Sequence, residues 1–329
     1  MTDDDLARLL RAVDPARTPV DAPIPLEAER RVREIVGRPA ARRRRPVLAW
    51  ASAAAVVVLV FAIVTGMLWM PTDSASALTP KPLSYTAVAD DAAQVIARAQ
   101  ARLAETDEPR VPERRSLALG WYFSLSVDGG EATVFRREWV DLRWNADRSG
   151  SVVTTAAEAT NADGDTVPAG EPRPGTVVGE LTFLKNQFTP ISPDPPAATA
   201  EAMRSVVTAS TGIDTPTAGD AMIGARTLQG EWTLTDAQQS ALLDVVGAAS
   251  DLRVLGTTED RIGRPVVGLS GIPSGPINAR VTLLLSTETG RIVGFESALV
   301  EADAQLDLPA GSLTDYTLWD VTDREDAPR

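Results

Sequence analysis

The most prominent pattern in the chain is an uninterrupted apolar stretch at residues 47–70. It contains no charged residue, and Ser52 and Thr65 are its only side chains with a hydroxyl group. As a helix, these 24 residues would rise about 36 Å, which exceeds the roughly 30 Å of a bilayer's hydrocarbon core. Trp50 and Trp69 stand near the two ends, where aromatic side chains gather at membrane interfaces. The pattern predicts one transmembrane helix.

Positive charge is concentrated on one side of this stretch. Four consecutive arginines precede it: Arg42, Arg43, Arg44 and Arg45. Lys81 is the only nearby cation after it. Because basic residues remain on the cytoplasmic side of a membrane span, we expect residues 1–46 in the cytoplasm and residues 71–329 outside the cell membrane. The four arginines and the two tryptophans are then the expected interface anchors, in contact with the lipid bilayer.

Two other interpretations of the apolar stretch are less favourable. A buried core helix is rarely so long and so free of polar residues. A cleaved signal peptide fits the small-residue pattern Ala75-Ser76-Ala77, and the mature chain would then begin at Leu78. Against cleavage, the stretch is longer than the apolar region of a signal peptide, and 46 residues precede it. A retained single-pass anchor is the better interpretation.

Residues 1–46 have the pattern of a short basic segment. Apolar residues at helical spacing predict short helices at 5–13 and 25–36. Neither has enough apolar surface to fold alone, so a tether is the simpler interpretation, and a docking peptide for a cytoplasmic regulatory protein is the alternative. The run of arginines is too short to indicate nucleic-acid binding.

The pattern after the span indicates a linker and then a folded domain. Residues 71–87 are rich in Pro, Ser and Thr and are expected to form the linker, and residues 88–329 the domain. A helix is expected at 90–105, capped by Asp90 or Asp91. Its apolar side is expected to consist of Ala93, Ile96, Ala97 and Leu103. Three strand-like segments follow, at 117–127, 133–144 and 151–160.

Residues 161–175 contain many turn formers and few apolar side chains, which predicts a long exposed loop. Asn161, Asp163 and Asp165 have a faint likeness to a calcium loop. Pro172 stands where such a loop needs a bidentate Glu, so no metal site is expected.

The rest of the chain is helical in its middle and returns to strands at its end. Helices are expected at 197–209, 218–228 and 236–249, the last beginning with a capping box of Thr235 and Gln238. Strands are expected at 252–258, 265–270, 280–286, 291–301 and 314–321. The order strands, helices, strands predicts an α+β domain, with a curved antiparallel β-sheet in the form of an incomplete barrel covered by helices.

Composition excludes several kinds of chemistry. The 329 residues include no Cys and no His, so a thiol nucleophile, an imidazole base, a disulfide and a Cys/His zinc site are all excluded. A Ser–Lys dyad would need Lys81 or Lys185, and neither has a recognisable motif around it. Acidic residues are abundant but show no organised site. We therefore expect a protein that is not an enzyme and has no cofactor.

The net charge differs on the two sides of the predicted span. Residues 1–46 hold 11 basic and 8 acidic groups, a net charge of +3, and residues 71–329 hold 21 and 37, a net charge of −16. The strongly acidic outer part argues against a broad surface for anionic polymers or lipid head groups.

Several segments resemble a family of uncharacterised actinobacterial single-pass membrane proteins. The residues that carry the resemblance are LLRAVDPA at 9–16, LRVLG at 252–256, RPVVGLS at 264–270, LLLSTETGRIVGFES at 283–297 and YTLWDV at 316–321. The resemblance covers most of the chain but includes no catalytic signature. It implies a short cytoplasmic segment, a basic stop, one membrane span and an extracytoplasmic domain.

The strand, Thr-Gly turn and strand at 286–295 also resemble, more distantly, the sheets of periplasmic lipoprotein carriers and of periplasmic regulators of anti-sigma factors. This resemblance implies an incomplete barrel that holds an acyl chain between its sheet and its helices. It also implies a signalling context with extracytoplasmic-function sigma factors. The chain departs from the zinc-type anti-sigma pattern, which requires His and Cys.

These observations favour a membrane-anchored extracytoplasmic binding or sensing protein for an apolar or lipid-like ligand. The candidate groove-lining residues are Trp121, Phe123, Trp139, Trp144 and Trp232. At any single one of these positions, packing in the core is the better interpretation. The alternative function is regulation of an extracytoplasmic-function sigma factor through the cytoplasmic segment. The sequence does not predict an oligomeric state.

Overall fold

The computed structural model describes residues 79–105, 109–122, 134–168 and 170–320. The predicted transmembrane helix at 47–70 and segment 1–46, with the six interface anchors, lie outside these residues. None of the described helices is both long enough and apolar enough to cross a membrane.

Nine of the described strands form one sheet in which every neighbouring pair is antiparallel. In sheet order they are β6 (Val177–Phe183), β3 (Gly150–Ala156), β2 (Glu138–Trp144), β1 (Arg115–Tyr122), β11 (Leu313–Leu318), β10 (Ile292–Ala298), β9 (Arg280–Ser286), β8 (Pro265–Gly271) and β7 (Arg253–Glu259). In chain order, β1 and β11 are the first and last of these nine strands, and they are neighbours at the centre of the sheet. A separate small hairpin consists of β4 (Ala159–Thr160) and β5 (Thr166–Val167).

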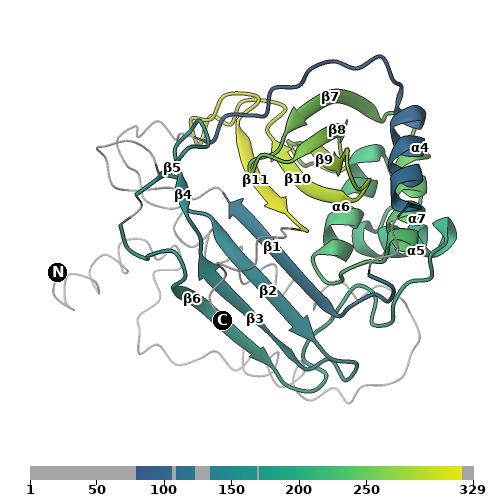
Figure 1. The fold of residues 1–329 in the computed structure, drawn as a ribbon, viewed down its shortest axis with the longest axis horizontal. Helices are drawn as coiled ribbons and strands as arrows, with labels where there is room; N and C mark the ends of the chain where they lie inside the picture. The colour runs from purple at the N-terminus through teal and green to yellow at the C-terminus, as the bar shows by residue number, and fades with distance from the viewer. Residues whose placement is uncertain (1–78, 106–108, 123–133, 169, 321–329) are drawn as a thin grey trace, which may run out of the picture. The chain divides into compact units, whose positions relative to one another are not determined.

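Four helices pack together beside one half of the sheet (Figure 1). They are α4 (Ala92–Leu103), α5 (Ala200–Thr211), α6 (Ala218–Gln229) and α7 (Asp236–Gly247). Helix α6 packs on β8 and β9, and α4 packs on α7. Strands β1, β2, β3 and β6 extend away from this helical layer (Figure 1). The helices therefore cover the sheet unequally.

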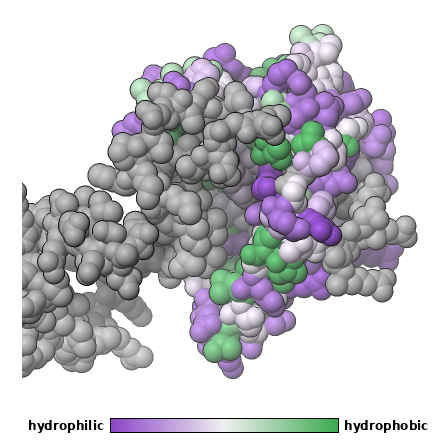
Figure 2. All heavy atoms as spheres, turned by 90° about the vertical axis from the view of Figure 1, so that its left-hand side faces the viewer, coloured by the Kyte–Doolittle hydropathy of each residue, from purple (hydrophilic) through white to green (hydrophobic). Residues whose placement is uncertain are grey.

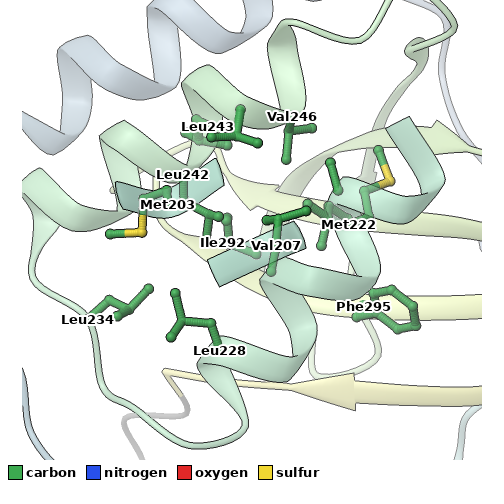
Figure 3. Packing of buried hydrophobic residues seen from close by; sticks show 14 of the residues in the cluster. Met203, Val207, Met222, Leu228, Leu234, Leu242, Leu243, Val246, Ile292 and Phe295 are labelled. Atoms are coloured by element: carbon green, nitrogen blue, oxygen red, sulfur yellow. The ribbon is translucent and has the colours of Figure 1, made fainter. Parts of the chain in front are cut away.

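Alternation along the strands gives the sheet two apolar faces. On β9, Leu283 belongs to the core between the sheet and the helices, whereas its neighbour Leu284 belongs to a second core on the opposite face. Figure 3 shows the first core, where Met203, Leu242 and Ile292 come from two helices and β10 and pack together. We call the opposite side of the sheet the outer face.

The outer face is covered in part by residues 79–88, which we call the strap. Thr86 exchanges two backbone hydrogen bonds with Thr257 of β7, at 2.8 and 2.9 Å. Tyr85 lies against Gly268 of β8, where a Cβ atom would come within 2.5 Å of its ring. Most of the strap falls in the predicted linker 71–87, so this end of the linker is bound to the sheet.

The structure confirms an α+β fold built on an open antiparallel sheet with four helices. The capping box of Thr235 and Gln238 is present at the start of α7, and β9 spans the predicted residues 280–286. The predicted loop at 161–175 is partly wrong, because residues 166–167 form β5. Strand β6 was not predicted, since Gly179 and Glu180 interrupt its apolar pattern.

Candidate functional site

Two of the candidate groove residues, Trp144 and Trp232, lie together in the core on the helix side. Their ring centroids are 4.9 Å apart with an interplanar angle of 81°, an edge-to-face contact. Each indole N–H is satisfied within the fold: Trp144 donates to the carbonyl of Glu231 at 2.8 Å, and Trp232 to that of Ser192 at 3.0 Å. Both are almost fully buried. Their position is that of core residues between the sheet and the helices.

The other candidates lie elsewhere. Trp121 belongs to the outer-face core, where its ring makes an edge-to-face contact with Phe135 and is stacked on the ring of Tyr316. Trp139 packs against the same core, and Phe123 lies outside the described residues. Because a side chain on one face of a sheet does not reach the other face, the four described tryptophans do not line one groove.

The core between the sheet and the helices is filled. Met203 of α5, Leu242 of α7 and Leu283 of β9 are each 0% exposed. Figure 3 shows side chains of the helices and of β10 packing together in this layer. The described side chains at the centre of this layer therefore leave no space for an acyl chain.

A cavity lies beside α4. Its volume is about 90 Å³, and its apolar lining comes from the end of the strap, α4 and β8. These apolar residues are Val88, Val95, Ala99 and Val267, and Thr257 of β7 lies beside them. The polar residues that also border the cavity are Asp90, Arg98, Arg102, Ser286 and Thr287. The combination is a mostly apolar hollow that is bordered by two arginines.

Local sequence features hold α4 close to the rest of the domain. Asp91 caps its first turn in a capping box with Gln94. Gly290, at a φ of +75°, passes so close to the carbonyl oxygen of Ala99 that a Cβ atom would lie 2.0 Å from it. At Gly247 a Cβ atom would come within 2.7 Å of Ile96. The helix is thus seated against two glycines, and the cavity remains at its side.

The arginines beside the cavity are exposed and paired with acidic neighbours. The Arg98 side chain, 64% exposed, lies 2.9 Å from the carboxylate of Asp90. Arg102 lies 3.0 Å from that of Glu105. Exposed ion pairs of this kind contribute little stability, so either guanidinium is able to exchange its partner for another anion.

Part of this site was visible in the sequence. The helix was predicted with Ile96 and Leu103 on its apolar side, and both are buried. Ala93 and Ala97 are exposed, contrary to the prediction. The residues that line the cavity from α4, Val95 and Ala99, were missed. Packing against the neighbouring α7 decides which side of this alanine-rich helix is buried. The sequence of the helix alone does not show it.

An ionisable group, Glu231, lies where the helical layer meets the half of the sheet that extends away from it, namely β1, β2, β3 and β6. The carboxylate of Glu231 accepts the backbone N–H of Ile191 at 2.8 Å. Burial raises the pKa of Glu231 to about 8, although hydrogen bonds from Ile191 and Ser192 favour its charged form. Glu231 is therefore expected to change its charge near neutral pH.

A second buried acid holds the strap to the outer face. Glu296 of β10 pairs with Arg261 at 2.7 Å, and both side chains are less than a tenth exposed. Arg261 also donates to the carbonyl of Lys81 in the strap at 3.1 Å. Burial raises the pKa of Glu296, and the neighbouring Arg261 opposes that rise.

The residues with a faint likeness to a calcium loop form an ordinary turn. The Asn161 side-chain oxygen accepts the backbone N–H groups of Asp163 and Asp165, each at 2.9 Å. Asp163 pairs with Lys81 of the strap. In the part of the chain that the structure describes, no group of three metal-ligating side chains comes together.

No family model matches the chain, and no curated protein matches it. One solved structure with some likeness is the complex of MucA and MucB from Pseudomonas aeruginosa, with 12% sequence identity and a TM-score of 0.24. The match covers 69% of this chain and 55% of that chain, so this chain corresponds to about half of its length. A likeness this weak supports no conclusion about fold or function.

Proposed function

We propose that the chain is a non-enzymatic, membrane-anchored protein whose extracytoplasmic domain binds a small amphiphile beside α4. The observation that carries the proposal is the apolar cavity with Arg98 and Arg102 at its border. An apolar group in the cavity gains from leaving water, and an acidic head group gains from the two guanidinium groups.

The volume of the cavity limits the size of the apolar group that it can hold. At about 90 Å³ it is smaller than the roughly 300–1,000 Å³ of typical small-molecule pockets. It therefore suits a short apolar group or the end of a medium-length alkyl chain, and an enclosed long acyl chain does not fit. A carboxylate on that chain matches the arginines despite the acidic character of the domain, because the attraction is local.

The connection of the cavity to the anchor favours a sensing role. Val88, at the end of the strap, lines the cavity, and the strap leads back along the chain toward the predicted span. A ligand that displaces Val88 would act on the segment that joins the domain to the membrane. In this proposal, the chain between Val88 and the predicted span would connect ligand binding to the anchor.

The test is equilibrium binding of labelled octanoate to the full chain in lipid nanodiscs. Val88→Phe fills the cavity from its rim and is expected to weaken binding at least tenfold. Val111→Phe is the matched control, because Val111 is 69% exposed and lies away from the cavity. Arg98→Gln together with Arg102→Gln is expected to weaken binding of the carboxylate but not of octanol. Equal binding by wild type and Val88→Phe would refute the proposal.

A second candidate function adds a cytoplasmic partner. In this version residues 1–46 bind an extracytoplasmic-function sigma factor, as the family resemblance implies, and the strap connects ligand binding to that interaction. The test is a pull-down with a peptide of residues 1–40 and purified sigma factors, with a scrambled peptide as control. Failure to retain any sigma factor would leave this segment as a tether only.

A further inference from the structure

The two edge strands of the nine-stranded sheet differ in whether another segment covers their free side. The edge at β7 is bridged by Thr86 of the strap, which exchanges two backbone hydrogen bonds with Thr257. At the other edge, β6 pairs with β3 on one side, and no described residue pairs with its free side. An open edge presents a row of unpaired backbone groups to other chains.

Strand β6 and its flank also expose apolar side chains. Those of Val177, Val178, Leu181 and Leu184 are 55%, 43%, 42% and 66% exposed. Figure 2 looks onto the side of the molecule where β6 lies in Figure 1, and the described surface there shows apolar patches among polar residues. Exposed backbone and exposed apolar side chains together are the features of a strand that another strand covers.

We infer that two copies of this chain pair through β6, antiparallel and centred on Leu181, so that the two sheets become continuous. The regular part of β6 is set by its pairing with β3. A register shift opposite Thr154 and Thr155 leaves Val178 as an extra residue, so regular pairing runs over residues 179–183. Leu181 is the midpoint of that segment.

The side chains are complementary in this register and not in its neighbours. Leu181 lies opposite the second copy's Leu181, and Glu180 lies opposite the second copy's Thr182. Centring on Glu180 would place two carboxylates directly opposite each other, which is destabilising. Centring on Thr182 would place Glu180 opposite Leu184, a charge against an apolar residue. The charge pattern therefore favours Leu181 as the centre, because in that register two copies of β6 pair without setting like charges opposite each other.

The absence of cysteine in the chain allows a position-specific test. In the proposed register the two Leu181 Cα atoms are about 4.5–5.5 Å apart, within the range that a disulfide bridges. The full chain with Leu181→Cys, oxidised in native membranes with copper phenanthroline, is expected to form a disulfide-linked dimer. The control is Ile277→Cys, which is similarly exposed at 51% but lies outside the sheet. Cross-linking at Leu181 should be at least tenfold faster.

A mixing experiment tests the register itself. Glu180→Cys and Thr182→Cys are opposite each other only when the two variants are mixed. Either variant alone places its cysteines on a diagonal of about 7–8 Å, beyond easy reach of a disulfide. The mixture is therefore expected to give more cross-linked dimer than either variant alone.

Two results would overturn the inference. The first is cross-linking of Leu181→Cys no faster than that of Ile277→Cys. The second is cross-linking of Leu181→Cys only to a different protein, which would assign the edge to a heterologous partner. Because the mutated side chains at 180, 181 and 182 are exposed, loss of folding is not expected to confuse the outcome.

Discussion

Strands β9 and β6 have the same length but opposite surroundings. Both have seven residues. Six of the seven residues of β9 are buried, because helices cover one of its faces and the outer-face core the other. In β6 only Phe183 is buried. Valine and leucine occur in both strands, so apolar content alone does not decide burial.

The difference shows that position in the sheet determines what an apolar strand residue does. In the centre of the helix-covered half, Leu283 stabilises the fold by filling the core. At the free edge, Leu181 remains 42% exposed and is available for contacts with another chain. The same residue type therefore serves stability in one half and, in our proposal, association in the other.

The largest expected effect is at the centre of the covered half. Leu283→Ala removes a side chain that is 0% exposed, and should lower the free energy of unfolding by about 2–5 kcal/mol through lost burial and the cavity left behind. Urea unfolding followed by circular dichroism measures this. Leu184→Ala, 66% exposed beyond the end of β6, is the control. A loss below about 1 kcal/mol for Leu283→Ala would show that the helical layer is loosely packed.

The second largest effect is expected at Glu231, where the helical layer meets the half of the sheet that extends away from it. Its folded pKa of about 8 is above the ordinary value of 4.5, because burial disfavours the charge. The stabilisation from its neutral form is therefore complete below pH 4.5 and is lost as pH rises toward 8. Between pH 5 and pH 8 the wild type should lose about 2–4 kcal/mol of its free energy of unfolding through this group. Glu231→Gln should not show this loss.

The measurement is urea unfolding of wild type and Glu231→Gln at both pH values. Identical pH dependence in wild type and Glu231→Gln would mean that the fold leaves this carboxyl accessible to water.

A smaller effect is expected where the strap covers the sheet. Gly268→Ala places a methyl group within 2.5 Å of the Tyr85 ring, and should cost about 1–3 kcal/mol by forcing the strap away from β8. Tyr85→Leu in the same chain should recover part of this loss. Comparing the double variant with both single variants gives the coupling energy, and additive effects would place the strap off the sheet in solution.

The smallest effect is expected at the free edge. Leu181→Thr should change the free energy of unfolding of the monomer by no more than about 0.5 kcal/mol, since the side chain is half exposed and threonine suits a strand. The unfolding is measured at the lowest protein concentration that gives a signal, so that association does not contribute. A loss of 2 kcal/mol or more would show that another part of the chain packs on this edge.

Local patterns predicted much of the architecture. The capping box at Thr235, the helix after Asp91 and the strand at 280–286 all follow from interactions between residues close together in sequence. For the same reason, the prediction of strands, helices and strands yielded the α+β class. The predicted membrane span at 47–70 rests on sequence alone, because it lies outside the described residues.

The candidate site depended on contacts that are distant in sequence. Trp121 and Trp144 were candidates for the lining of one groove, with core packing as the other interpretation, and β1 and β2 direct them to opposite faces. The cavity beside α4 is bordered by Ser286 and Thr287, almost 190 positions after Ala99, and Gly290 lets the same turn approach the helix. No local pattern reports such an approach.

The sequence by itself determined the uncharged span, the charge difference around it, the exclusion of thiol and imidazole chemistry, and the order of most helices and strands. These properties depend on composition or on neighbours along the chain. Tertiary structure alone decided which face each aromatic residue occupies, that the core is filled, that the strap protects the β7 edge and that β6 remains open. Those properties depend on strand order and packing, which bring together residues that local spacing does not connect.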